Sequence, residues 1–360
     1  RQTGLGLFTD VGATFFLSRL DGQLGLYLAL TGARLTGAQA FFAGMASHFV
    51  PADRLEALEA RLAELDQAAT KDDVNAAIEE FAADAAELKV ALANYTLVGP
   101  IRRAIDVIFQ RKTAEEIVAD LKALAEGSLS LNKILRTGEE DKHAALKAWA
   151  KETADTIENS SPTSVKLTLL AVRQGAVLTI DEAFQADMRI ATACCVRCSS
   201  SPSLDTKADE PSWQNPVVHP DFKAGAKHIL IDKNRVDRAP WFPATLEEVN
   251  VADLKKIFFS SPAPFDHPPV PPFPVSDRAY SQYPHARFSL PSEKAIRSVV
   301  RGEDPASGSG APSLANVVEI LQRKWGGKVG VKEKVEEVVA RQCKVDDGKW
   351  LTWPSGKDAI

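Results

Sequence analysis

Apolar residues early in the chain repeat at intervals of three and four. This spacing runs through Leu55, Leu58, Leu62 and Leu65, which places all four on one face of an amphipathic helix. A second helical run is expected from about Asp72 to Ala93. These two segments are therefore predicted to be helical.

Capping motifs predict further helices along the chain. Thr113 and Glu116 form a T-x-x-E capping box that opens TAEEIVADLKALAEG, and Gly127 is expected to close that helix. Thr179 and Glu182 form a second box, which opens TIDEAFQADMRIATACC after the helical stretch SVKLTLLAVRQG. Each motif fixes one end of a helix from residues within a single turn.

Strand signals are few by comparison. Residues 54–195 are predicted to be overwhelmingly helical, whereas SHFVP at 47–51 and KHILID at 227–232 are short, ambiguous strand candidates. SSPAPFDHPPVPPFPVS, at 260–276, holds seven of the 21 prolines, which favours polyproline II and a linker or extended strap. A last helical region is expected from Leu314 to Cys343.

Composition narrows the class of protein. A chain of 360 residues with 45% apolar and 25% charged side chains is typical of a globular protein with one to three domains. The formal charge of −5 gives no overall electrostatic argument for nucleic acid or an anionic membrane. No run approaches the roughly 18 apolar residues that span a bilayer, so no membrane association is expected.

The four cysteines give a weak metal signal. Cys194, Cys195, Cys198 and Cys343 are too few and too unevenly placed for a disulfide framework. Cys195 and Cys198 form a C-x-x-C, but without a second such pair or a nearby pair of histidines, free thiols are favoured and no metal is expected. KWGGKVGVKEK lacks the order of a P-loop, so no nucleotide site follows.

Several motifs recur in a fixed order through most of residues 3–233. This order resembles the 3-hydroxyisobutyryl-CoA hydrolase branch of the enoyl-CoA hydratase/isomerase (crotonase) superfamily, in a fungal form. That branch carries PET-x-IG-x-x-PDVG, then LPRL-x-G-x-LG-x-x-LALTG and AG-x-ATH-x-V. The matching segments here are Thr3–Gly6, Phe8–Gly12, Leu17–Leu20, Leu28–Gly32, Ala43–Val50, Ser160–Leu169, TIDEAFQADMRIATAC and Asp221–Lys233.

The resemblance implies a fold class and a division of the chain. The family fold is the α/β crotonase (ClpP-like) spiral of β-β-α turns, and this chain is expected to hold mostly its C-terminal part and so to be predominantly helical. The end of the core, with the rim of the acyl-CoA pocket, is expected at 1–53, and a helical region covering the pocket at 54–195. An insertion (196–218) and a C-terminal crotonase helix with its following segment (219–259) come next. A proline-rich linker (260–277) and a helical extension (278–360) complete the division.

The resemblance also implies site residues. The family uses two carboxylates eight residues apart; Asp10 matches the second, and Gln2 occupies the position of the first, a glutamate. Asp10 would orient the substrate hydroxyl or the attacking water, whereas the amide of Gln2 cannot act as a base or nucleophile. Gly12, Phe8 and Lys233 are expected to bind substrate. By residue type alone, an aspartate before a glycine is more often a plain turn residue.

Two other polar residues have weaker functional readings. Arg19, like Lys233, would suit the 3′-phosphate of CoA, although a solvated charge is the usual role of such residues. His48 lies beside a presumed strand and is expected to be a structural histidine rather than a catalyst.

The expected activity is hydrolysis of an acyl-CoA thioester in valine breakdown in mitochondria, as the resemblance implies. No separate cofactor is expected, because CoA is part of the substrate, and a homo-oligomer is expected. The alternatives are an enoyl-CoA hydratase and a structural protein of the fungal mitochondrial small ribosomal subunit. A ribosomal role would tolerate loss of the catalytic glutamate.

The position of the motifs predicts that this sequence lacks part of the catalytic core of the family. Both oxyanion-hole segments of the family precede the PET turn, where this sequence begins, so the 360 residues alone are expected to be a truncated, inactive part of the hydrolase. Val196 to Gln214 interrupts the family pattern, which suggests a retained intron, and Arg1-Gln2 suggests a mis-spliced junction.

Overall fold

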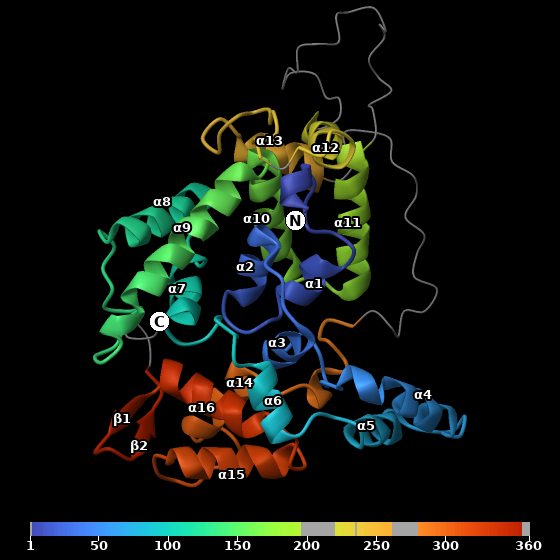
Figure 1. The fold of residues 1–360 in the computed structure, drawn as a ribbon, viewed down its shortest axis with the longest axis vertical. Helices are drawn as coiled ribbons and strands as arrows, with labels where there is room; N and C mark the ends of the chain where they lie inside the picture. Colours follow the sequence, from blue (N-terminus) through green and yellow to red (C-terminus); the bar gives the residue numbers. More distant parts are fainter. Residues whose placement is uncertain (1, 196–219, 235, 261–279, 355–360) are drawn as a thin grey trace, which may run out of the picture. The chain divides into compact units, whose positions relative to one another are not determined.

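The computed structural model describes residues 2–195, 220–234, 236–260 and 280–354 (Figure 1). Within these ranges the predicted predominance of helix is confirmed, and the strands are β1 (Lys344–Asp346) and β2 (Trp350–Thr352). They pair antiparallel, with Val345 opposite Leu351. The insertion 196–218 and most of the proline-rich 260–277, together with Arg1 and Cys198, lie outside the described residues.

The chain divides into two compact units, each built from separated segments. The first comprises Arg1–Arg19, Gln23–Ala33 and Ile105–Tyr283, and the second Leu20–Gly22, Arg34–Ala104 and Pro284–Ile360. Residues 54–195, expected as one helical region, therefore contribute to both units, because the chain passes from one core to the other within α7 (Gly99–Ile108).

All regular secondary structure in the described part of the first unit is helical. Its α-helices are α1 (Ala13–Leu17), α2 (Leu24–Thr31), α8 (Ala114–Glu126), α9 (His143–Asn159), α10 (Pro162–Gly175), α11 (Ile180–Cys195), α12 (Pro220–Ala226) and α13 (Val251–Leu254). Short 3-10 turns form at Thr3–Leu5 and Glu140–Lys142, and π-helical turns at Lys227–Ile231 and Lys255–Phe259.

Local signals set the ends of these helices. The Thr113–Glu116 capping box at the start of α8 is confirmed, and Gly127 ends that helix in left-handed backbone at φ 89°. At the start of α11 half of the expected box forms: the Thr179 N–H donates to Glu182, and the Thr179 hydroxyl donates to Asp181. Capping chemistry therefore predicted both helix starts.

An apolar cluster around Phe8 forms part of the core of the first unit. Phe8 is fully buried and clusters with Leu167 of α10, Ile190 of α11 and Phe258. Close backbone packing joins α10 to α1: a Cβ at Gly175 would lie 2.2 Å from the carbonyl oxygen of Thr14. Only glycine fits at such a distance, so this residue sets how closely α10 approaches α1.

The second unit combines early and late segments of the chain. It holds α3 (Gly37–Phe42), α4 (Leu55–Ala63), α5 (Lys71–Glu79), α6 (Ala85–Ala91), α14 (Glu293–Val300), α15 (Leu314–Lys324) and α16 (Val331–Gln342), with 3-10 turns at Ala52–Arg54 and Ala286–Phe288. Its core joins Phe41 and Leu88 to Ile296, Leu321 and Val335. The late helices are thus an integral part of this core.

Two strand expectations are wrong. Residues 47–51 form no strand, and KHILID instead continues α12 as the π-helical turn Lys227–Ile231. These segments were too short for a period-two pattern to distinguish strand from helix.

Two helical runs are interrupted, and one apolar face is poorly covered. Asp84 caps a new helix, α6, inside the expected run from Asp72 to Ala93. Gly326, Gly327 and Gly330, all with positive φ, separate α15 from α16. The predicted leucine face of α4 has no buried residue, and Leu55 is 51% exposed.

Within the described ranges, no helix combines the length and the apolar character that a membrane crossing requires.

Candidate functional site

Asp10 starts a tight turn between the Thr3–Leu5 turn and α1. The N–H of Ala13 donates to the Asp10 carbonyl over 3.1 Å and closes the turn. Val11 and Gly12 both have left-handed backbone, at φ 53° and 79°. Glycine adopts this region freely, but a β-branched residue does so rarely and at a cost. Because Val11 is also 77% exposed, the turn must be held by its neighbours rather than by burial of that side chain.

Helix α11 supplies the groups that hold the turn. The carboxylate of Asp187 accepts hydrogen bonds from the Gly12 N–H over 2.8 Å and from the Thr14 hydroxyl over 2.9 Å. The ring of Phe184 packs against Gly12, where an added Cβ would lie 2.9 Å from the ring. Phe184 and Asp187 are three residues apart and so share one face of the helix. Asp187 was missed in the sequence, where it could have been noticed only as an acidic residue inside a capped helix.

The Asp10 side chain pairs with Gln2, the residue expected at the position of the family glutamate. The amide Nε2 of Gln2 donates to Asp10 Oδ1 over 2.9 Å, so the two positions expected to form the catalytic pair do lie together. Burial raises the pKa of the half-buried Asp10 carboxyl, and a hydrogen bond from its own backbone opposes this. The arrangement is one carboxylate held by a neutral amide.

The pKa of Asp187 is also raised, to about 6. Burial is the main cause, and the charge of nearby Asp10 adds to it, while the hydrogen bonds from Gly12 and Thr14 act in the opposite direction. Asp187 therefore carries its charge at neutral pH, although less favourably than an exposed aspartate would.

The other expected binding residues lie in different surroundings. Phe8 is fully buried in the core, and the Gly12 N–H is already bonded to Asp187. Lys233 is exposed, at φ 53°, after the turn Lys227–Ile231. Among the described residues no hydrogen bond or ion pair connects Lys233 to the Asp10 turn. The structure thus brings Gln2, Asp10 and Gly12 together, but not Phe8 and Lys233 as ligand-facing groups beside them.

The Arg19 side chain is held by hydrogen bonds within the first unit. Its guanidinium donates to the backbone carbonyls of four residues, which are Phe15, Gly175, Leu178 and Ser281. It also lies over the Phe15 ring, 3.5 Å from the centroid, and burial lowers its pKa. Because these carbonyls occupy the guanidinium, Arg19 is poorly placed to bind a CoA phosphate.

A second buried carboxylate of this unit lies on α12. Asp221 is fully buried and accepts from the Ser161 hydroxyl over 2.5 Å and from the Phe242 N–H over 2.9 Å. Burial raises its pKa to about 6, opposed by these two hydrogen bonds. Asp221 thus ties α12 to the start of α10 and to the Phe242 segment.

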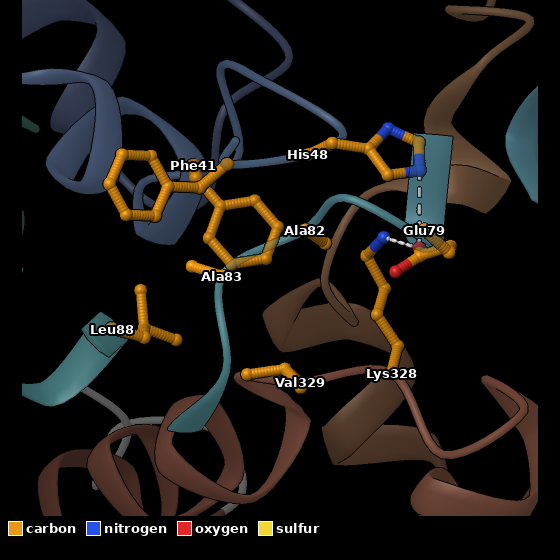
Figure 2. Close-up of a pocket in the computed structure, with 9 residues that line it drawn as sticks. Phe41, His48, Glu79, Ala82, Ala83, Leu88, Lys328 and Val329 are labelled. Carbon is orange, nitrogen blue, oxygen red and sulfur yellow. Dashed lines mark hydrogen bonds and ion pairs between the residues drawn. The ribbon is translucent and has the colours of Figure 1, made fainter. Parts of the chain in front are cut away.

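A small pocket of the second unit contains His48 (Figure 2). Nε2 of His48 lies 3.1 Å from Glu79 Oε1, and Nζ of Lys328 pairs with the same oxygen. Burial opposes ionisation of Glu79, but the hydrogen bonds from His48 and Lys328 outweigh it and lower the Glu79 pKa. The cavity of about 10 Å³, beside Phe41 and Leu88, is close to the space of a single water. This environment is that of a buried polar network, with no strand beside His48.

No group of three or more metal-ligating side chains occurs in the described ranges. Cys194 is buried, with a pKa raised by that burial, and Cys195 is exposed. The C-x-x-C cannot be assessed, since Cys198 lies outside the part of the chain that the structure describes.

Known proteins match this chain closely enough to assign its family. The profile of the family described as enoyl-CoA hydratase/isomerase matches residues 2–258. The small ribosomal subunit protein mS47 of Neurospora crassa is 31% identical over 355 residues, which is 95% of this chain and 59% of that protein. The mitochondrial 3-hydroxyisobutyryl-CoA hydrolase of Danio rerio is 33% identical over 263 residues, which is 72% of this chain and 55% of the hydrolase.

Solved structures give a looser match. A carnitinyl-CoA dehydratase from Mycobacterium thermoresistibile has a TM-score of 0.47 at 27% identity, covering 73% of this chain and 59% of that one.

The family profile and the two relatives confirm the resemblance to 3-hydroxyisobutyryl-CoA hydrolases and to a fungal mitochondrial ribosomal protein, and the profile confirms the crotonase fold class. The chain spans only somewhat more than half the length of these relatives. The residues matched by the family profile cover most of the chain, including the Asp10 turn, and the chain belongs to the enoyl-CoA hydratase/isomerase family.

Proposed function

We propose that the protein containing this chain hydrolyses an acyl-CoA thioester, as 3-hydroxyisobutyryl-CoA hydrolases do, and that it works in mitochondria. The observation that carries the proposal is the Asp10 carboxylate, half-buried and set at the start of a turn held by α11. A carboxylate whose pKa is raised by burial is a better proton acceptor near neutral pH than an exposed one. The mitochondrial relatives named as hydrolases support the same chemistry.

In this proposal Asp10 orients and deprotonates the water that attacks the thioester carbonyl. The negative charge that develops on the carbonyl oxygen requires fixed N–H donors. The Gly12 N–H is not one of them, because it is already bonded to Asp187. Gln2 donates to Asp10 and orients it but supplies no second base, so hydrolysis would depend on a single carboxylate.

The test is hydrolysis of 3-hydroxyisobutyryl-CoA by the full-length natural protein, followed as release of free thiol. Asp10→Asn is expected to lower the rate by about 100-fold or more, the usual contribution of a general base. Asp155→Asn, on the exposed surface of α9, is the matched control and should leave the rate unchanged. A rate for Asp10→Asn equal to that of the unaltered protein would remove Asp10 from the mechanism.

A second candidate function is a structural role in the mitochondrial small ribosomal subunit. The observation that favours it is the extent of the matches: the mS47 relative covers 95% of this chain, whereas the Danio rerio hydrolase covers 72% and the family profile ends at residue 258. The late helices α14 to α16 lie beyond residue 258 and build the core of the second unit. Their similarity to mS47 supports a shared role for that part of the chain.

Sedimentation of mitochondrial lysates distinguishes this second candidate. A ribosomal protein is expected in the small-subunit fraction at low salt, and to leave that fraction at high salt if phosphate contacts hold it there. A protein found only in the soluble fraction at every salt concentration would exclude the ribosomal role and leave the hydrolase proposal standing.

A further inference from the structure

Asp187 is a buried carboxylate to which no role has been assigned in the proposed hydrolysis. It lies on α11, only 5% exposed, and each of its oxygens accepts one hydrogen bond from the segment that follows Asp10. The donors are the Gly12 N–H and the Thr14 hydroxyl. One bond is therefore made to the turn itself and the other to the first residues of α1, which follow it.

That turn needs an outside partner to keep its shape. Val11 has positive φ, a conformation that is strained for a β-branched residue and persists only where the surroundings impose it. A hydrogen bond to an ionised carboxylate is stronger than one between neutral groups. Asp187 thus supplies two charge-assisted bonds to the backbone and side chain that directly follow the strained residue.

The ring of Phe184 limits the turn from the same helix face. It fills the space beside Gly12, so the turn cannot shift toward α11 without a clash. The hydrogen bonds of Asp187 hold the turn against α11, and the ring of Phe184 limits how closely the turn can approach that helix. Together they determine where Asp10 begins the turn and points its carboxylate at Gln2.

We propose that Asp187 is a positioning residue for the Asp10 carboxylate, acting through the Val11–Gly12 turn and without touching the substrate. Its catalytic consequence rests on the proposed thioester hydrolysis, whereas its hold on the turn does not. Without the Asp187 carboxylate, the Gly12 N–H loses its acceptor and Val11 relaxes toward negative φ. The Asp10 carboxylate then moves away from the position in which it accepts the hydrogen bond from Gln2.

Asp221 provides a matched control within the same unit. It is as buried as Asp187, accepts hydrogen bonds from Ser161 and Phe242 and has a pKa raised to about 6 by the same cause. Its partners, Ser161 and Phe242, lie outside the Asp10 turn. Asp221→Ala should therefore match Asp187→Ala in general destabilisation but not in its effect on the turn.

The experiment compares these variants in the full-length protein by two readouts. Hydrogen exchange of a peptide covering residues 8–16 reports on the turn whether or not the protein is active. Asp187→Ala is expected to exchange there roughly 10-fold faster than the unaltered protein, while Asp221→Ala exchanges there at the unaltered rate. Equal exchange in Asp187→Ala and the unaltered protein would overturn the proposal.

Thioester hydrolysis is the second readout. Asp187→Ala should lower kcat by roughly 10- to 100-fold with little change in KM, because the base is misplaced while substrate contacts persist. Asp187→Asn retains the shape and an acceptor for Gly12, and should recover part of kcat. If the unaltered protein does not hydrolyse the thioester but the exchange result holds, the proposed function fails and the hold on the turn stands. An unchanged kcat in an active protein carrying Asp187→Ala would contradict the positioning role.

Discussion

The side-chain amide of Gln2 donates a hydrogen bond to the carboxylate of Asp10 across 2.9 Å. These residues lie eight positions apart on either side of the Thr3–Leu5 turn, which brings their side chains together. At this distance a carboxyl group in place of the amide would lie within hydrogen-bond reach of Asp10.

Replacing this amide should therefore restore the second carboxyl group. In Gln2→Glu, two carboxyl groups would face each other at hydrogen-bond distance, and their mutual repulsion would raise the pKa of one of them so that the pair shares a proton. We expect thioester hydrolysis by the full-length protein to rise by about 10-fold or more. The measurement is initial rate of thiol release against pH.

Gln2→Ala is the control that distinguishes the effect of a new carboxyl group from the effect of losing the Gln2 amide. It removes the donor to Asp10 without supplying a carboxyl group, so its rate should not exceed that of the unaltered protein. If Gln2→Glu and Gln2→Ala have the same rate, position 2 has no catalytic part in this protein.

A buried ionic network in the second unit predicts a pH-dependent stability. Glu293 pairs with the fully buried Arg341 over 2.5 Å and with Arg102 over 3.0 Å. Burial opposes ionisation, but Arg341, Arg102 and Lys334 outweigh it and lower the Glu293 pKa to about 2. A folded-state pKa below the unfolded value means that the stabilisation is present above about pH 4.5 and is lost as pH falls toward 2.

Glu293→Gln should accordingly lower the free energy of unfolding at pH 7 by about 3–5 kcal/mol, because it removes the carboxylate that Arg102 and Arg341 share, although Arg341 keeps its pair with Glu337. The difference from the unaltered protein should shrink between pH 4 and pH 2. Denaturant unfolding at several pH values measures it. Glu319→Gln, at an exposed pair on α15, should change stability little; an equally small effect of Glu293→Gln would contradict the network's contribution.

The close approach of α10 to α1 predicts a steric effect. Gly175→Ala would place its Cβ 2.2 Å from the carbonyl oxygen of Thr14, so the two helices must separate. We expect a loss of about 1–3 kcal/mol in the free energy of unfolding. Gly4→Ala, where no atom lies within 4 Å, is the control and should be tolerated. Equal stability of the two variants would show that the helices adjust at no cost.

The raised pKa of Asp221 predicts a stability change of opposite sign to that of Glu293. Its folded pKa, about 6, exceeds the ordinary pKa of an aspartate, about 3.9, so the folded state binds the proton more tightly and gains stability as pH falls from about 7 to 4. Asp221→Asn cannot titrate. The difference in unfolding free energy between the unaltered protein and this variant should therefore increase by about 1–3 kcal/mol over that range. A difference that is constant with pH would contradict the raised pKa.

The sequence by itself determined the helical character and several helix ends, and it singled out Gln2 and Asp10 of the candidate site but not Asp187. Thr113 with Glu116, and Gly127, predicted the two ends of α8, because capping depends on groups within one turn of the backbone. The family motifs placed Gln2 and Asp10 in register eight residues apart.

The tertiary structure alone decided which distant groups meet. The bond from Gly12 to Asp187 spans 175 positions, and the pairing of Arg19 with the Leu178 carbonyl spans 159. Tertiary packing also decided the division into two compact units. It made KHILID a helical turn, where the short-range pattern was ambiguous. Such contacts depend on how whole helices pack and which polar groups are buried together, and no local spacing of residues encodes that arrangement.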